Sequence, residues 1–337
     1  MTPPDPAPVI DLIQAFRRSK TMFTAASMGI FDLLHDAPAA AAEVAARLAA
    51  NPDATERLLD ACAALGLLRK REGVYENDPV ADTYLRAASP HTLYGYVRYS
   101  DEALYPMWNH LADAVREGTH RWRQTFGLDG PIFSAFFHTD EAMRDFLRGM
   151  HGFGMLTSPK VVAAFDLSRF RRIVDLGSAT GHLVAAACER YPELRGAVFD
   201  LPRVTAMARE EVARSSARDR IEVLAGDFFE DELPPADLYS VGQVLHDWNE
   251  AQIGRLLTRI FDRLPPGGAL LVAEKILEED GVGPIPANMQ SLGMLICTEG
   301  KERSLSEYSQ LLKRAGFSQV EGRRTGVPLD AILAVKP

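Results

Sequence analysis

The stretch at residues 174–182, VDLGSATGH, joins a short apolar strand to a helix through a glycine-containing turn. Glycines in such a turn let the backbone approach a ligand closely, and the first turn of the helix behind them favours a negatively charged group. Apolar strands separated by helices predict an α/β fold, a doubly wound parallel sheet covered on both faces. The expected strands lie at residues 172–177, 196–201, 221–226, 237–245 and 269–277.

Two further strand patterns close the chain, at residues 317–325 and 329–337, and no helix pattern separates them. We expect them to form an antiparallel pair at one edge of the sheet. Ligands of such an open sheet bind outside the carboxyl ends of its strands. The functional residues should therefore follow directly after the strand patterns.

The first half of the chain has a different pattern, helical from Asp11 to about Lys160 apart from two short strands at residues 67–71 and 74–78. Three helices followed by a hairpin are the layout of a winged helix. The third helix, at residues 53–64, contains three acidic residues and one arginine, so phosphate would repel it. We therefore expect a dimerisation or lid role rather than DNA binding.

Composition points to a small-molecule partner. Acidic residues outnumber basic ones by 46 to 37 among the 337 residues, and the net charge of −9 disfavours both nucleic acid and anionic membranes as partners. The three cysteines are far apart and form no C-x-x-C pair, which predicts neither a disulfide framework nor a zinc site. With no signal peptide pattern and no apolar run of membrane length, we expect a cytoplasmic protein.

Two of the expected strands end at residues suited to an adenosine group. Asp200 stands where a carboxylate can accept hydrogen bonds from both hydroxyls of a ribose. One strand further along, Asp227 could receive the amino group of adenine and Phe228 could pack on its ring. Together with the glycine turn, these three residues predict a cofactor that contains adenosine.

The turn itself narrows the choice of cofactor. It lacks the G-x-G-x-x-G pattern, because Ser178 and Ala179 stand where a pyrophosphate would need close backbone approach. S-adenosylmethionine has a carboxylate and no pyrophosphate. It therefore suits this turn better than NAD.

An ordered set of motifs extends over nearly the whole chain and resembles the class I O-methyltransferases of the plant caffeate and animal acetylserotonin type, bacterial relatives included. The motifs are VDLGSATGH, VFDLP, AGDFFEDELPPADLY, VLHDW, LPPGGALLVAEKIL and TEGKERS, with LADAVREGTHRWRQTFG and AFDLS in the first half and DAILAVK at the end. The resemblance implies a helical N-terminal winged-helix domain that forms a homodimer and a C-terminal Rossmann-like domain that binds S-adenosylmethionine. We expect residues 1–105 to form the dimerisation domain, 106–165 a helical linker or substrate lid, and 166–337 the methyltransferase domain.

The resemblance also implies roles for the residues at the cofactor site. Gly177 would line the methionine end of the cofactor, Asp200 would hold the ribose, and Asp227 with Phe228 would contact the adenine. Members of the acetylserotonin type tend to have an arginine at the position of Gln243, so any cofactor contact there would lack a charge.

The segment QVLHDWNE, residues 243–250, places a histidine after the fourth strand of the sheet. Methyl transfer to a hydroxyl needs alignment and a base, and an imidazole with a pKa near 6.5 is largely free to accept a proton at neutral pH. Asn249 could cap the following helix and so fix His246 in the loop before it. The resemblance assigns His246 as the base and Glu274 and Glu302 as the acids that orient it.

Other residues have weaker signals. We interpret Asp247 and Trp248 as supports of this loop, and the scattered histidines give no metal-ligand spacing, so no metal is expected. A small aromatic acceptor, of the phenol or hydroxyindole type, would be enclosed by apolar residues from both halves of the chain. The candidates for this pocket are Phe136, Phe137, Phe146, Met150, Phe153, Met289, Leu292 and Met294.

Three functions remain open from the sequence. The first is an S-adenosylmethionine-dependent O-methyltransferase acting on a small aromatic hydroxyl by in-line displacement. The second is a relative with the same cofactor that methylates sulfur, nitrogen or carbon, or that does not methylate at all. The third is a DNA-binding regulator that uses the cofactor fold as a sensor.

Overall fold

The computed structural model describes residues 3–337 and divides the chain into two compact units. The first unit comprises the described residues up to Tyr105 together with Arg144–Gly152. The second comprises Pro106–Met143 and Phe153–Pro337. The long helix α11 (Asp140–Ala163) contributes residues to both units. The three-part division of the chain at residues 105 and 165 remains a prediction.

The first unit contains the predicted helices and hairpin of a winged helix, with one more strand than expected. Strand β1 is only two residues long and pairs with β3, so the small sheet has the order β1-β3-β2. Glu72 and Gly73 form the hairpin turn, both with positive φ, as a tight two-residue turn requires. The elements are α1 (Ala7–Ser27), α2 (Ile30–Asp36), β1 (Ala39–Ala40), α3 (Ala41–Arg47), α4 (Pro52–Ala64), β2 (Leu68–Arg71), β3 (Val74–Asn77), α5 (Pro79–Tyr84), α6 (Tyr94–Tyr99) and a π-helical turn (Ser100–Leu104).

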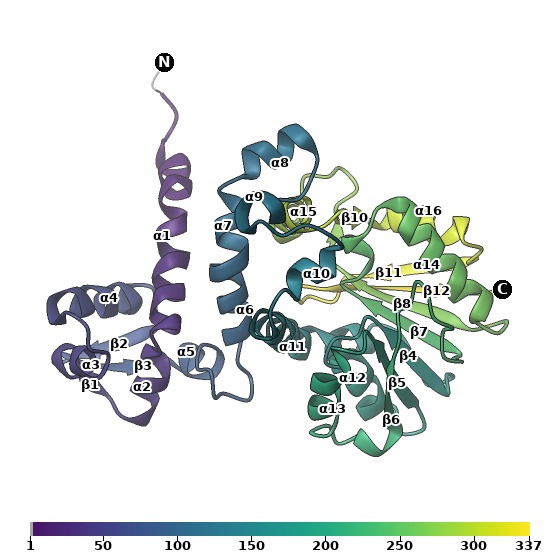
Figure 1. Cartoon of the computed structure of the whole chain (residues 1–337), viewed down its shortest axis with the longest axis horizontal. Coiled ribbons are helices and arrows are strands. Elements are labelled where there is room, and N and C mark those ends of the chain that lie inside the picture. Colours follow the sequence, from purple (N-terminus) through teal and green to yellow (C-terminus); the bar gives the residue numbers. More distant parts are fainter. Residues whose placement is uncertain (1–2) are drawn as a thin grey trace. The chain divides into compact units, whose positions relative to one another are not determined.

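The second unit is the predicted α/β domain, preceded by short helices (Figure 1). Its leading helices are α7 (Tyr105–Trp108), α8 (Leu111–Glu117), α9 (Trp122–Phe126) and α10 (Ile132–Phe136). Its helices after α11 are α12 (His182–Arg190), α13 (Thr205–Val212), α14 (Glu250–Arg263), α15 (Ile285–Cys297) and α16 (Leu305–Arg314), with 3-10 turns at Arg218–Arg220 and Leu245–Asp247. Its strands are β4 (Arg172–Leu176), β5 (Arg195–Asp200), β6 (Ile221–Ala225), β7 (Leu238–Gly242), β8 (Ala269–Glu274), β9 (Ile276–Leu277), β10 (Arg303–Ser304), β11 (Gln319–Arg323) and β12 (Asp330–Val335).

Seven of these strands form one sheet in the order β11-β12-β8-β7-β4-β5-β6. Strands β4 to β8 are parallel, and β12 and β11 add an antiparallel pair at the β8 edge, which confirms the expectation from the sequence. The chain runs outward in both directions from β4, which pairs with β5 on one side and with β7 on the other. A ligand is therefore expected at the carboxyl end of β4, where the strand order reverses.

Helices cover both faces of this sheet, and alternate residues of each strand face opposite cores. In β4, Val174 and Leu176 lie in the core beneath α14 and α16, whereas Ile173 lies in the core beneath α11, α12 and α13. Both cores are formed by side chains less than a tenth exposed. This double cover explains why the strands appear in the sequence as continuous apolar runs.

The fourth parallel strand is shorter than the sequence pattern indicated. β7 ends at Gly242, and not at Leu245, because Gln243 has a φ of 52° and turns the backbone out of the extended conformation. Residues Leu245–Asp247 then form a 3-10 turn. An apolar pattern alone does not reveal such a break, since Val244 and Leu245 are both buried.

Among residues 3–337, the longest helices are too polar to cross a membrane, and the apolar ones are too short.

Candidate functional site

The glycine turn follows β4 and is shaped by close neighbours. Gly177 has a φ of 68°, and a Cβ at this position would stand 3.0 Å from Val244 Cγ2 and 3.2 Å from Phe228 Cε1. Glycine is needed here for its backbone conformation and for the space that it leaves. Ala179 also has a positive φ, of 52°, a backbone conformation that residues other than glycine rarely adopt.

Asp200, at the end of β5, is bound to this turn. Its Oδ2 accepts a hydrogen bond from the Ala179 N–H at 2.7 Å, and its Oδ1 accepts one from the Leu201 N–H at 2.7 Å. Burial raises the pKa of Asp200 to about 7 although both hydrogen bonds oppose the rise. The carboxylate is thus held in one orientation and retains lone pairs for two further donors.

The third strand end carries the remaining predicted adenosine residues. Asp227 Oδ1 accepts a hydrogen bond from the Phe229 N–H at 2.8 Å, which fixes the direction of its side chain. The Phe228 ring lies against Gly177, as the Cβ distance above shows. Gln243 lies at the end of β7, where its N–H donates to the Ala273 carbonyl at 2.9 Å. These residues occupy the rim where the fold predicts a ligand.

The glycine turn is also held by a buried aspartate, which the sequence analysis did not single out. Asp175 in β4 accepts hydrogen bonds from Ser178 Oγ at 2.5 Å and from Ser240 Oγ at 2.7 Å. Burial raises its pKa to about 6. An acidic residue among the apolar residues of this strand could have marked Asp175 in the sequence. The hydrogen bond to Asp175 also gives Ser178 a role in holding the turn.

The structure brings His246, Glu274 and Glu302 together. The imidazole Nδ1 lies 2.8 Å from Glu302 Oε1 and 3.2 Å from Glu274 Oε2. All three residues are at least 95% buried. The two acids come from the end of β8 and from the segment before α16, so only the fold places them beside the histidine.

Glu274 also holds the backbone of the turn that carries His246. Its Oε1 accepts hydrogen bonds from the N–H groups of Val244 at 3.1 Å and Leu245 at 2.9 Å. On the other side of the ring, Asp247 Oδ1 lies 3.6 Å from His246 Nε2. We call residues 245–248 the histidine turn.

These charges change the proton affinity of the site. Burial by itself lowers the pKa of His246, but the three surrounding carboxylates outweigh it and raise the pKa to about 10. Burial raises the pKa of Glu274 to about 7 and that of Asp247 to about 6. The cluster therefore binds protons more tightly than its separate groups would, and the imidazole is a stronger base than a free histidine.

The same three residues have the composition of a metal site, and their ligand atoms lie within 4.8 Å of one another. Ligand atoms of a tetrahedral zinc site would stand about 3.3 Å apart. The 2.8 Å contact between Nδ1 and Glu302 is shorter and has the length of a charge-assisted hydrogen bond. We therefore interpret the cluster as a proton site.

Helix caps fix both ends of the cluster, and the sequence predicted the one at Asn249. The Asn249 side chain accepts a hydrogen bond from the Gln252 N–H and starts α14. Ser304 and Glu307 form a capping box that starts α16. The Trp248 ring packs edge-on against Phe229 at 5.0 Å between centroids, which fits its predicted supporting role.

The predicted acceptor residues fall in different places. Phe136, Phe137 and Met294 are buried in the second unit, where Phe153 is half-buried, whereas Met289 is 47% exposed. Phe146 and Met150 lie in the part of α11 that belongs to the first unit. Whether these residues enclose an acceptor stays a prediction.

Lys275, which the sequence did not single out, lies beside one of these side chains, Phe153. It is 8% exposed, and its Nζ donates to Gln290 Oε1 at 2.9 Å and stands 5.3 Å from the centre of the Phe153 ring. Burial lowers its pKa, against the effect of the two neighbouring glutamates. In the sequence, Lys275 could have been found only from its position, a lysine at the end of an apolar strand.

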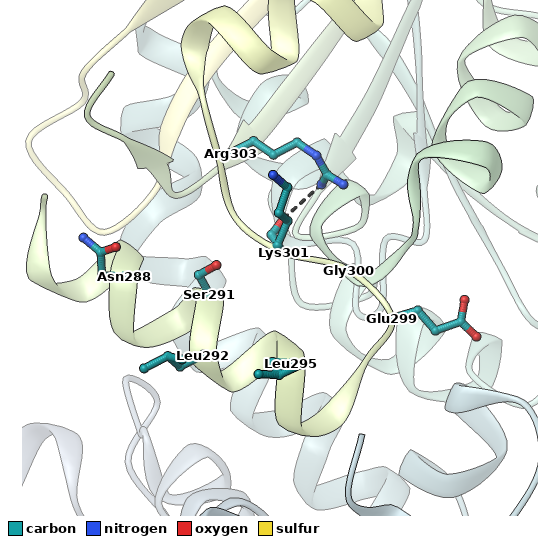
Figure 2. Close-up of a pocket in the computed structure, with 8 residues that line it drawn as sticks. All are labelled: Asn288, Ser291, Leu292, Leu295, Glu299, Gly300, Lys301 and Arg303. Carbon is teal, nitrogen blue, oxygen red and sulfur yellow. Dashed lines mark hydrogen bonds between the residues drawn. The ribbon is translucent and has the colours of Figure 1, made fainter. Parts of the chain in front are cut away.

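Leu292 lines a pocket of about 490 Å³ on the side of α15 that faces residues 299–303 (Figure 2). Besides Leu292, its lining residues are Asn288, Ser291, Leu295, Glu299, Gly300, Lys301 and Arg303. None of these is a member of the histidine cluster.

Comparison with known proteins shows the family of this chain. Residues 108–318 match the model of an O-methyltransferase domain, and residues 10–87 match the model of an O-methyltransferase dimerisation domain. Acetylserotonin O-methyltransferase from Gallus gallus is 40% identical over 338 residues, which cover 98% of this chain and 97% of that protein.

Two further relatives extend the comparison. A probable bifunctional dTTP/UTP pyrophosphatase/methyltransferase protein from Homo sapiens is 40% identical over 99% of this chain, which spans 54% of that protein's length. The crystal structure of human N-acetylserotonin methyltransferase in complex with SAM superposes with a TM-score of 0.94 at 37% identity, covering 100% of this chain and 99% of that one. With the family model matching well over half of its length, this chain belongs to the O-methyltransferase family.

Proposed function

We propose that this O-methyltransferase moves a methyl group from S-adenosylmethionine to the hydroxyl of a small aromatic acceptor of the hydroxyindole type, with His246 as the base. The buried contact of His246 Nδ1 with Glu302, beside the cofactor rim, carries this proposal. The acetylserotonin O-methyltransferases among its relatives support a hydroxyindole as the first acceptor to test.

The residues at the strand ends fit the cofactor. Gly177 leaves room where a Cβ would approach Val244 and Phe228, and Asp200 presents an oriented carboxylate to the ribose hydroxyls. Asp227 and Phe228 would contact the adenine, and Gln243 would contribute a neutral contact. When bound, S-adenosylmethionine supplies a methyl group that is already activated by its sulfonium.

His246 would receive the acceptor's proton at Nε2. Nδ1 is engaged by Glu302 and Glu274, so the proton on Nδ1 stays in place. Nε2 lies on the other side of the ring from these two glutamates, with Asp247 Oδ1 at 3.6 Å. A phenolic hydroxyl has a pKa near 10. The surrounding carboxylates raise the pKa of His246 towards that value, which favours proton transfer from the hydroxyl to the imidazole.

Transfer of a labelled methyl group to a panel of acceptors tests this function. The panel should contain N-acetylserotonin, simple phenols, and matched thiols and amines. We expect the label on a hydroxyindole oxygen, with a mass increase of one methylene. A product methylated at sulfur, nitrogen or carbon would favour the second function that the sequence left open.

Cofactor affinity should depend on pH through Asp200. Its carboxylate form accepts the ribose hydroxyls, and its pKa in the free protein is about 7. Affinity should therefore rise as pH increases through 7 and fall about tenfold for each unit below it. Calorimetry with S-adenosylhomocysteine from pH 5.5 to 8.5 measures this change.

Asp200→Asn is the control for this prediction. It should weaken binding about 10- to 100-fold at pH 8, because two charge-assisted hydrogen bonds are replaced by weaker ones, and remove most of the pH dependence. The same slope in both proteins would assign the pH dependence to another group.

The oligomer that we propose is a homodimer formed through the first unit. The match to a dimerisation domain supports it, and so does a row of exposed apolar residues on α1 that includes Leu12 at 75% and Ile13 at 64% exposure. Light scattering should give the mass of two chains. We also retain the cytoplasm as the proposed compartment, with the three cysteines free and buried.

A further inference from the structure

The segment at residues 299–303, which we call the strap, lies directly against the histidine turn. At Gly300, a Cβ would stand 2.1 Å from the His246 carbonyl oxygen and 2.7 Å from the Trp248 nitrogen. Both of these neighbours are backbone atoms, which cannot rotate away as a side chain can. Gly300 is therefore required for close approach between the two backbones.

Hydrogen bonds connect the strap to the turn on both sides of His246. The Glu299 N–H donates to the Asp247 carbonyl at 3.2 Å. The Arg303 guanidinium reaches the carbonyls of Leu245 at 3.4 Å and Trp248 at 3.5 Å.

Arg303 is itself fixed in place. It is 2% exposed, and it donates to the Lys301 carbonyl at 2.9 Å within the strap (Figure 2). Its planar fork holds its donors in a fixed arrangement, whereas the donors of a lysine rotate on a single flexible ammonium.

The strap also carries Glu302 and is anchored to β9, the short strand that follows Glu274. Immediately after Glu302, β10 pairs in parallel with β9, with Arg303 opposite Ile276. Glu274 stands two residues before Ile276, at the end of β8. One short segment thus sets the position of the turn and of the carboxylate that binds the imidazole.

The outer side of the strap borders the pocket of about 490 Å³ described above, which Gly300 and Arg303 both line. Packing on that side is therefore incomplete. Besides the pairing of β10 with β9, the position of the strap depends on its contacts with the histidine turn, which approaches it most closely at Gly300.

We propose that the strap is a positioning element for His246, in which Gly300 and Arg303 hold the turn at the distance where Nδ1 meets Glu302. This inference rests on the proposed role of His246 as the base. Neither Gly300 nor Arg303 acts on the acceptor in it. Both act through the histidine.

Gly300→Ala is the decisive variant. The added methyl group must separate the strap from the turn, and a displacement of about 1 Å at a reacting group can cost about 100-fold in rate. We expect kcat to fall by about that factor, with the affinity for S-adenosylhomocysteine unchanged, because the strap does not carry the residues at the ends of β4, β5 and β6.

A second readout does not need an acceptor. NMR titration of the His246 imidazole, with labelled histidine and bound S-adenosylhomocysteine, reports its contact with the acids. Its surroundings contain the carboxylates of Glu274 from β8, Glu302 from the strap and Asp247 from its own turn. The imidazole should titrate at lower pH in Gly300→Ala, because Glu302 moves away with the strap.

Gly254→Ala is the matched control. Gly254 lies in α14, and a Cβ there would meet nothing within 4 Å. This variant should keep both kcat and the titration of the wild type. Arg303→Lys keeps the positive charge and loses the planar guanidinium. It should lower kcat and the titration pH of His246, as Gly300→Ala does, but to a smaller extent.

The outcomes separate the two proposals. If both Gly300→Ala and Arg303→Lys keep the wild-type kcat and the wild-type titration of His246, the proposed role of the strap is wrong. A lower kcat with an unchanged titration of His246 would also contradict it. If Gly300→Ala does not fold, Arg303→Lys decides by the same two readouts. If the wild-type protein transfers no methyl group, the proposed function fails and the titration still tests the strap.

Discussion

Replacing His246 with alanine should lower methyl transfer by about 10²- to 10⁴-fold, which is the usual contribution of a positioned general base. The acceptor hydroxyl would then have no group to take its proton, while the cofactor residues at the ends of β4, β5 and β6 stay in place. Single-turnover measurement of labelled methyl transfer gives the rate of the chemical step. Calorimetry with S-adenosylhomocysteine should give nearly the wild-type affinity.

His91→Ala is a suitable control, because His91 is exposed and lies in the first unit, among residues that we place in no site. It should keep the wild-type rate. His246→Gln should be as slow as His246→Ala, since an amide fills similar space and does not accept a proton at neutral pH. An unchanged rate in either His246 variant would remove the histidine from the mechanism.

The sequence predicted the elements that depend on local order. The alternation of apolar strands and helices located the sheet, and the side chain of Asn249 marked the start of α14, because helix caps are set by a few neighbouring residues. The rule that ligands bind at strand ends then placed Gly177, Asp200 and Asp227 on one rim before any contact was known.

The sequence could not predict contacts between distant segments. His246 and Glu302 are 56 residues apart, and they meet because β10 pairs with β9 and the strap lies against the histidine turn. The need for glycine at position 300 comes from a backbone that lies far from it in the chain. The apolar pattern also predicted the wrong end for β7, because a positive φ at Gln243 ends the strand within an apolar run.

The raised pKa of His246 is a further property that only the fold could supply. An isolated histidine has a pKa of about 6.5. In this structure, the carboxylates that enclose the ring raise the pKa of His246 to about 10. A free imidazole would be largely neutral at pH 7, whereas this one would be mostly protonated. The pH dependence of the reaction therefore shows whether the base is an imidazole with an ordinary pKa or one with a raised pKa.

Glu302→Gln should move that pH dependence to lower pH. In the wild type, kcat/KM should rise about tenfold per pH unit above neutrality, because only the neutral imidazole accepts a proton and its pKa is about 10. Removal of one carboxylate charge within 4 to 6 Å lowers the pKa of a cationic group by about 1 to 3 units. The rise should therefore level off at a pH lower by at least about one unit.

The maximal rate of Glu302→Gln should also be lower, since a less basic imidazole takes the proton less readily and the amide can present its NH₂ to Nδ1 in place of its oxygen. Rate profiles from pH 6 to 10 measure both effects. Glu250→Gln removes one negative charge from an exposed position on α14 and should leave the profile unchanged. A shift of the same size in both variants would be an effect of overall charge, whereas no shift in Glu302→Gln would show that Glu302 does not control the proton affinity of His246.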